Sequence, residues 1–170
     1  QIKMPEMPEV ETIASGLRKR IIGKRISRVR LSGFALRRPL DRGFAENLRG
    51  RTVRRIMRRG KYLVVVLDPS AFWLIHLGMS GRILYHARPE AGDKHAHVIV
   101  QFSDFTELEY RDPRRFGLMA VYDVPRLSLV PEIRALGRDP LNSGFNGSWL
   151  ESQLKKSRQE IKSFLLDQRK

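Results

Sequence analysis

The sequence predicts a mainly β fold, because short apolar stretches alternate with turn residues over most of its length. Between Lys24 and about Asp123, about eight runs rich in Val, Ile, Leu and aromatic residues are separated by turn signals such as Asp68-Pro69-Ser70. Runs of this length and spacing are typical of a β-sandwich or a β-barrel. The expected strands are Ile26–Leu31, Val53–Met57, Tyr62–Leu67, Phe72–Leu77, Arg82–Tyr85, His97–Phe102, Glu107–Arg111 and Leu118–Tyr122. Of these, Tyr62–Leu67 is nearly all apolar, so we expect it to be buried on both faces.

A helix is predicted ahead of the strands. Pro8 suits the first position of a helix, and Glu9 and Glu11 suit the positive end of its dipole. The apolar residues that follow recur at intervals of three and four, which places them on one helical face. They are Val10, Ile13, Ala14, Leu17 and Ile21. Gly23 is the expected stop of this helix.

After Pro125 the pattern becomes helical and more polar, which predicts a second module. Residues 136–141 have the Gly, Asp and Pro content of a linker. Ser148 is the expected cap of a following helix, with Glu151 at its third position. The apolar stripe continues at Ile161, Phe164 and Leu165.

The charge balance points to a polyanionic partner. The chain has 33 Lys and Arg against 18 Asp and Glu, a net charge of +15, and its pI is about 11.0. Contacts to phosphates release counterions, so nucleic acid is the leading candidate partner. The alternatives are a solubilising surface or a ribosome-associated protein.

Several classes of site and location are disfavoured. The chain has no cysteine, which removes disulfides, thiolate zinc sites and cysteine nucleophiles. No apolar run approaches the length that spans a bilayer, and charged residues interrupt any signal-peptide pattern at the start, so we expect no membrane association and a cytoplasmic location. His95 and His97 have metal-like spacing, but without a further clustered ligand we expect no metal there.

Six short motifs follow one another along almost the whole chain. They are Met4-Pro5-Glu6-Met7-Pro8-Glu9-Val10-Glu11-Thr12, Arg59-Gly60-Lys61-Tyr62-Leu63, His76-Leu77-Gly78-Met79-Ser80-Gly81, Lys94-His95-Ala96-His97-Val98, Asp112-Pro113-Arg114-Arg115-Phe116-Gly117, and Ile161-Lys162 followed by Leu165-Leu166-Asp167-Gln168. Taken in this order they resemble the formamidopyrimidine-DNA glycosylase family. Met7 before the second proline favours this branch over the related endonuclease VIII branch, which usually has glycine there. One departure is Ala96, where the family often has an acidic residue.

The resemblance implies a β-sandwich of about eight strands with an N-terminal helix, followed by the first helices of a truncated helix-two-turn-helix domain. On that basis we expect an N-terminal catalytic domain over residues 1–130, and a linker with the start of the DNA-binding domain over 131–170. The family continues with a four-cysteine zinc finger, so a structural zinc is expected in the full-length protein and no cofactor in this chain. The resemblance implies a bacterial protein that is a monomer, acts on damaged double-stranded DNA and is associated with the nucleoid through that DNA.

By the same resemblance, the catalytic residues are Pro5, Glu6 and Lys61, supported by Glu9 and Lys162. A free amine at Pro5, with a pKa of about 8, can attack the deoxyribose C1′ of a damaged nucleotide and form a Schiff base. Glu6 can act as general acid on the sugar ring oxygen, and Glu9 either positions Glu6, shuttles protons or only caps the helix. Lys61 would grip a phosphate beside the lesion.

The DNA-binding residues that the resemblance implies are His76, Met79, His95, Arg114 and Phe116. An enzyme that acts on a base inside a duplex must extrude it, and Met79 and Phe116 would then fill or wedge the gap. Arg114 has planar donors that suit the estranged partner base. Each residue also has an ordinary structural interpretation: Met79 as core filler, His76 as a satisfied core histidine, and Arg114 as a solvated side chain of an Asp-Pro turn.

The predicted function is that of a bifunctional DNA glycosylase and abasic-site lyase that excises oxidised purines such as 8-oxoguanine and formamidopyrimidines in base excision repair. Gln1-Ile2-Lys3 precede Met4, and if they are retained Pro5 is an amide without a nucleophilic lone pair. This leaves a non-catalytic binder of damaged DNA as the alternative. A basic RNA-binding β-protein is a third hypothesis, which explains neither the Pro-Glu opening nor the wedge.

Overall fold

The computed structural model describes residues 5–167 and 169–170. Met4 and Gln168, which belong to the first and last of the six motifs, lie outside the described residues. The chain divides into two compact units, one ending at Pro125 and the other beginning at Arg126. The division comes slightly before the boundary predicted at residue 130, and each unit is described by itself.

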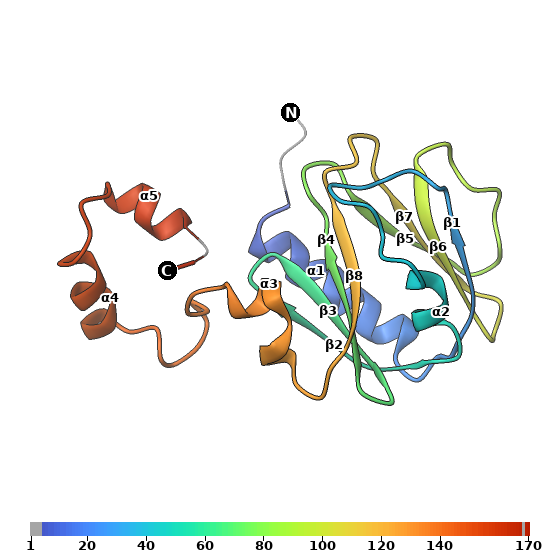
Figure 1. Cartoon of the computed structure of the whole chain (residues 1–170), viewed down its shortest axis with the longest axis horizontal. Helices are drawn as coiled ribbons and strands as arrows, with labels where there is room; N and C mark the ends of the chain where they lie inside the picture. The colour runs from blue at the N-terminus through green and yellow to red at the C-terminus, as the bar shows by residue number, and fades with distance from the viewer. Residues whose placement is uncertain (1–4, 168) are drawn as a thin grey trace. The chain divides into compact units, whose positions relative to one another are not determined.

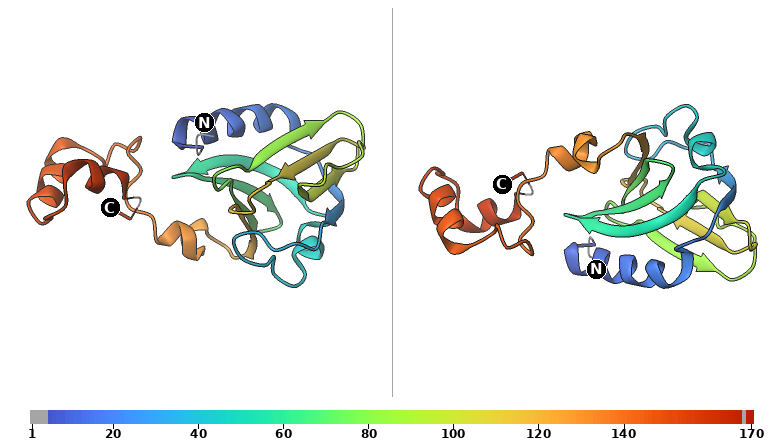
Figure 2. Two further views of the ribbon diagram at one scale, coloured as in Figure 1. Left: turned by 90° about the horizontal axis from the view of Figure 1, so that it is seen from above. Right: turned by 90° about the horizontal axis from the view of Figure 1, so that it is seen from below.

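The first unit is a β-sandwich of two antiparallel four-stranded sheets, as Figures 1 and 2 show. One sheet has the order β2-β3-β4-β8 and the other has the order β1-β6-β7-β5. The strands are β1 (Ile26–Leu31), β2 (Thr52–Arg59), β3 (Tyr62–Asp68), β4 (Ala71–His76), β5 (Arg82–His86), β6 (Ala96–Phe102), β7 (Glu107–Arg111) and β8 (Leu118–Asp123). This confirms the predicted fold class and chooses the sandwich over the barrel, since each sheet keeps two open edges.

Helix α1 (Met7–Ile21) precedes the sheets and packs against β2 and β3. Its buried residues recur at helical spacing and lie in the same apolar core as the inward-facing residues of both sheets. Pro8 stands in its first turn, and Gly23, with φ of 83°, follows its end. Gly23 is therefore where the stop of the helix was expected, whereas Pro8 occupies the second helical position and not the first.

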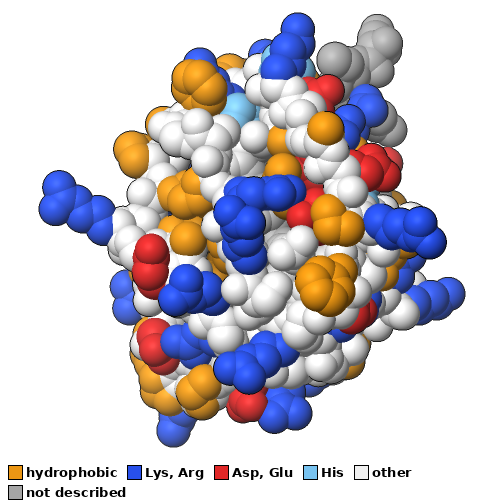
Figure 3. Space-filling view, turned by 90° about the vertical axis from the view of Figure 1, so that its right-hand side faces the viewer, with side chains coloured by type: hydrophobic (Ala, Val, Ile, Leu, Met, Phe, Trp, Pro, Cys, Tyr) orange, Lys and Arg blue, Asp and Glu red, His pale blue; other side chains and the backbone are white. Residues whose placement is uncertain are grey.

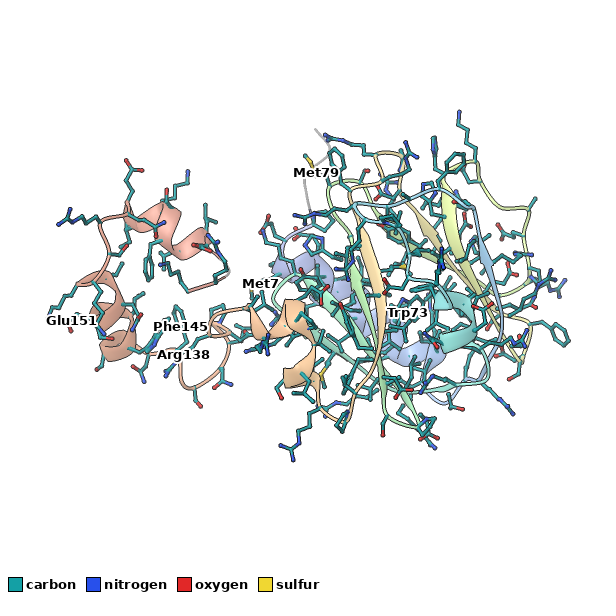
Figure 4. The ribbon with its side chains drawn as sticks, in the orientation of Figure 1. Met7, Trp73, Met79, Arg138, Phe145 and Glu151 are labelled. Atoms are coloured by element: carbon teal, nitrogen blue, oxygen red, sulfur yellow. The ribbon has the colours of Figure 1, made fainter. Side chains whose placement is uncertain are left out.

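The core between the sheets is apolar and centred on β3 and β4. Trp73 of β4 lies between the two sheets (Figure 4) and is almost fully buried. On β3, Leu63, Val64, Val65 and Leu67 are buried, which agrees with the prediction for that strand. The reason is its position: β3 is an inner strand, hydrogen-bonded on both sides by β2 and β4.

Two short helices were not predicted. Helix α2 (Phe44–Leu48) buries Phe44 and Leu48 in the core, and α3 (Pro131–Arg134) follows a 3-10 turn, η1 (Leu127–Leu129). Helices of four or five residues are too short to produce a recognisable 3.6-residue period. Within the described residues, no helix is long and apolar enough to cross a membrane.

The second unit also contains α4 (Gly147–Leu154) and α5 (Ile161–Leu166). The cap of α4 was predicted wrongly as Ser148. The side chain of Asn146 instead accepts a hydrogen bond of 2.9 Å from the Trp149 backbone N–H. Asn is as good a cap as Ser, and the helix begins one residue before Ser148.

Candidate active site and DNA interface

The predicted general acid, Glu6, is held at the start of α1. It is the N-cap residue of that helix, and its backbone N–H donates to Glu9 Oε2 at 3.0 Å. The positioning and capping interpretations of Glu9 therefore agree, because a capping carboxylate at this position also fixes the backbone of Glu6. Pro5 immediately precedes this cap and is partly buried.

Lys61 meets Glu6 directly. Its Nζ lies 2.7 Å from Glu6 Oε2, and the Lys61 side chain is only 13% exposed, whereas that of Glu6 is 37% exposed. Lys61 lies in the two-residue turn between β2 and β3. Gly60, with φ of 56°, opens this turn, and a residue without Cβ takes that conformation at little cost.

Among the basic residues near Lys61, Arg58 has a structural role. Arg58 Nε lies 3.3 Å from Glu11 Oε2, and the Arg58 side chain is 5% exposed. Glu11 Oε1 also accepts from Arg18 Nη1 at 2.8 Å, so this carboxylate joins α1 to β2. Arg58 therefore anchors α1 to β2.

His76 is the last residue of β4 and lies opposite Tyr62 in the sheet register. The two rings contact at 4.9 Å between centroids. The Gly78 backbone N–H donates to His76 Nδ1 at 3.0 Å, so in the neutral ring the proton resides on Nε2.

The environment keeps His76 neutral. Burial lowers its pKa to about 4; the charges of Arg37 and Lys61 act in the same direction, and Glu6 opposes them. His76 is therefore an uncharged N–H donor at neutral pH. The same electrostatic coupling places it within reach of the Glu6–Lys61 pair, and Arg37 is a member of this group that the sequence did not indicate.

Met79, Arg114 and Phe116 gather around one hollow with His76. The hollow has a volume of about 660 Å³ and is lined by Ala35, Leu36, Arg37, His76, Gly78, Met79, Arg114, Arg115 and Phe116. Met79 lies at the end of the sandwich where the described chain starts (Figure 4). The Arg114 guanidinium stacks 4.8 Å from the ring centroid of Phe116, whose side chain is 46% exposed. This exposure disfavours the interpretation of Phe116 as a buried core residue.

Two glycines let the loops that carry these residues touch backbone to backbone. A Cβ added to Gly78 would lie 2.4 Å from the Phe116 carbonyl carbon, and one added to Gly117 would lie 1.7 Å from Tyr110 Oη. Gly78 also has φ of 64°. The loop between β4 and β5 and the loop between β7 and β8 therefore fit together only with glycine at these positions.

His95 belongs to a neighbouring hollow. It lines a space of about 290 Å³ together with Phe34, Lys94, His97, Pro113 and Arg115. His97 is buried, its Nδ1 lying 3.0 Å from Ser32 Oγ and its Nε2 lying 3.0 Å from the Asp112 carbonyl. The loop 112–117 thus contributes to both hollows, and the structure does not bring His95 into the one that holds Met79.

Lys162 lies on α5 in the second unit, where its side chain is exposed. Its supporting role stays a prediction. Within residues 5–167 and 169–170, no three His, Cys, Asp or Glu side chains gather as a metal site would require.

The surface of the first unit is basic but mixed in sign. Figure 3, which looks from the side of β1, shows Lys and Arg side chains spread over this side with Asp and Glu between them. Arg30 of β1, for example, pairs with the buried Glu107 of β7 at 2.9 Å. The paired arginines of this sheet are therefore partly neutralised.

Comparison with known proteins gives the same assignment as the motifs. The model of the formamidopyrimidine-DNA glycosylase N-terminal domain matches residues 4–119, which is more than half of the chain. The chain belongs to this family. The resemblance inferred from the six motifs is thereby confirmed.

Two curated formamidopyrimidine-DNA glycosylases illustrate the relationship. One, from Wolbachia pipientis subsp. Culex pipiens, is 42% identical over 164 residues, which cover 96% of this chain and 60% of that protein. Another, from Caulobacter vibrioides, is 40% identical over 179 residues, with 98% and 62% covered. The chain therefore spans about 60% of the length of these glycosylases.

Solved glycosylase structures have the same fold. The Lactococcus lactis formamidopyrimidine-DNA glycosylase bound non-covalently to DNA with an AP site has a TM-score of 0.86 and 29% identity, covering 97% of this chain and 63% of that one. The same enzyme in complex with DNA containing FAPY-dG has a TM-score of 0.85 and 29% identity, with 96% and 62% covered.

Proposed function

We propose that this chain forms the N-terminal catalytic part of a bifunctional DNA glycosylase and abasic-site lyase that removes oxidised purines, including formamidopyrimidines and 8-oxoguanine, in base excision repair. The single observation that carries the proposal is the ion pair of 2.7 Å between Glu6 and Lys61, directly after Pro5 and coupled to His76. The residue that would supply the nucleophile is thus followed directly by a carboxyl group that is paired with a cation, and an N–H donor is electrostatically coupled to that pair.

The proposed reaction begins at the Pro5 nitrogen. With this nitrogen as a free secondary amine, its lone pair attacks C1′ of the damaged nucleotide, and the electron pair of the glycosidic bond leaves with the base. The attack leaves the Pro5 nitrogen positively charged and still carrying its proton; the Glu6 carboxylate takes this proton and delivers it to the sugar ring oxygen, the bond between C1′ and that oxygen breaks, and an iminium forms between Pro5 and C1′. The iminium acidifies the C2′ proton, and loss of that proton expels the phosphate at C3′, which cleaves the strand.

Three further groups would bind the DNA. Lys61 and the neutral His76 provide a cation and an Nε2–H donor for phosphate oxygens next to the lesion. Phe116, stacked under Arg114, suits the role of a wedge that enters the duplex while the damaged nucleotide is outside the stack. The complexes of the Lactococcus lactis relative with AP-site DNA and with FAPY-dG DNA support these substrate classes.

The test is borohydride trapping with the full-length protein and a duplex that contains an abasic site. We expect a covalent protein–DNA product whose peptide map places the adduct on Pro5. Glu6→Gln and Lys61→Met should each reduce the rate of trapping by about 10²-fold or more, the usual scale for a general acid or an essential charge.

Lys24→Met is the matched control. Lys24 also pairs with a carboxylate, at 2.6 Å from Asp104, and its side chain is 19% exposed, but it lies in the turn that follows α1 and not at its beginning. Trapping by this variant should stay within about twofold of the unmodified protein. Tight binding of abasic duplex without any trapped product, in a protein whose mass shows a free Pro5, would refute the lyase and leave the non-catalytic binder.

A further inference from the structure

The loop that carries Arg114 and Phe116 begins with a buried carboxylate that the proposed chemistry does not use. Asp112 follows β7 and is 0% exposed. A carboxylate removed from water needs hydrogen bonds or an opposite charge to offset its desolvation. Asp112 has hydrogen-bond donors from three separate places in the sequence.

These donors tie two loops to the sheet. Ser80 Oγ donates to Asp112 Oδ1 at 2.6 Å, and Tyr110 Oη and the Gly117 backbone N–H donate to Oδ2 at 3.0 and 2.8 Å. Ser80 belongs to the loop that carries Met79, Gly117 ends the loop that carries Phe116, and Tyr110 lies on β7. Burial raises the pKa of Tyr110, and the facing carboxylate adds to this, so Tyr110 stays a protonated donor.

The connection extends to the backbone of the arginine. The Arg114 backbone N–H donates to Ser80 Oγ at 3.3 Å, and the Arg115 N–H donates to the Asp112 carbonyl at 3.1 Å. Arg115 has φ of 57°, a left-handed conformation that costs energy for a residue with Cβ. The hydrogen bonds around Asp112 supply the constraint that keeps the loop in this shape.

We propose that Asp112 is a positioning residue for lesion recognition: its carboxylate joins the Met79 loop to the Arg114–Phe116 loop, so that the three side chains are presented to the duplex as one preformed unit. This inference rests on the proposed function. Loops that are ordered before binding do not lose conformational freedom on binding. Because Met79 and Phe116 would enter the gap that an extruded nucleotide leaves, this advantage applies to the distorted duplex, and the unit favours it over the undamaged one.

The experiment compares the affinities of the full-length protein for abasic-site and undamaged duplexes. Asp112→Asn keeps the shape but offers one acceptor oxygen where the carboxylate offers two. We expect its preference for the abasic duplex to fall about tenfold, with its affinity for undamaged DNA unchanged. A 2-aminopurine placed opposite the abasic site should show a smaller fluorescence increase, because the wedge enters less often.

A double-mutant cycle separates positioning from general stability. If Asp112 acts through the placement of Arg114, Asp112→Asn should add little to the loss of preference that Arg114→Ala causes alone. Tyr110→Phe removes one donor while leaving the carboxylate in place, so it gives a milder test. We expect the preference of this variant for the abasic duplex to fall about threefold. Asp104→Asn, at the opposite end of β7, is the matched control and should keep the full preference.

The outcomes distinguish the two proposals. A folded Asp112→Asn protein that keeps the full preference overturns the positioning role alone, as does a cycle in which the two losses add. An unmodified protein with no preference for the abasic duplex and no trapped product overturns the proposed function, and the positioning role with it.

Discussion

At the scale of single residues, His76 is a group whose charge the fold controls directly. It accepts from Gly78 at Nδ1, and Arg37 and Lys61 add to the effect of burial in holding its pKa near 4. An unfolded histidine takes up a proton near pH 6.5. The stability that neutral His76 contributes is thus complete above pH 6.5 and is lost as the pH falls toward 4.

We therefore predict that His76→Asn flattens the pH dependence of stability. The Asn Oδ1 can accept the Gly78 hydrogen bond but cannot become cationic. Between pH 7 and pH 5 the unmodified protein should lose about 1–2 kcal/mol more stability than the variant, measured by urea unfolding. Parallel pH profiles for the two proteins would contradict this account of His76.

For Phe116 we predict a small effect on stability and a large effect on DNA binding. Phe116→Ala should change the free energy of unfolding by about 0.5 kcal/mol or less, because its ring is half exposed, yet it should weaken binding to the abasic duplex about tenfold or more. Phe105→Ala is the matched control, since Phe105 is 70% exposed in the turn between β6 and β7. Equal losses of DNA binding in the two variants would show that Phe116 has no special role.

Sequence reasoning proposed the candidate site residues one by one, but it did not predict the contacts between them. Glu6 and Lys61 were both predicted, yet their pairing depends on a turn that brings the β2–β3 connection to the start of α1. Asp112 was interpreted as a turn residue, and only the structure reveals that its carboxylate is buried. A short polar side chain after a strand has the same local pattern in either case.

At the scale of elements, the strand pattern was predictable because each strand has its own apolar run. The missed elements were the short helices α2 and α3, and the missed boundary was the cap of α4. The pairing of β1 with β6 joins segments far apart in sequence, so no local pattern indicates it. Local signals fix which residues form strands, whereas tertiary packing fixes their order in the sheets.

The close packing of Gly117 against Tyr110 yields a prediction about glycine. Gly117→Ala should destabilise the protein by about 2–4 kcal/mol, because its methyl group would overlap Tyr110 Oη. Gly16→Ala should instead stabilise it by about 0.5–1 kcal/mol, since Gly16 lies within α1 and nothing approaches its added Cβ within 4 Å. Thermal unfolding measures both, and an unchanged midpoint for Gly117→Ala would show that Gly117 is not tightly packed against Tyr110.

At the scale of the whole molecule, the net charge of +15 predicts binding to DNA that weakens steeply with salt. Lys61→Met should reduce the slope of log K against log salt by about 1, the effect of losing one phosphate contact. Arg49→Ala is the control: Arg49 is exposed and lies with Arg25 and Ser103 around a separate hollow, away from the two loops. If both substitutions reduced the salt-dependence slope equally, the attraction between protein and DNA would be diffuse, with no defined path for the DNA backbone.

The alternation of side chains along the loop 112–117 makes its length as consequential as its composition. Arg114 and Phe116 border the hollow with Met79, Pro113 borders the one with His95, and Arg115 borders both. Inserting one residue after Pro113 would shift the register, so that a cation would stand where the aromatic ring now stands. Libraries that seek altered lesion preference should therefore vary side chains here while keeping the spacing between Arg111 and Leu118 constant.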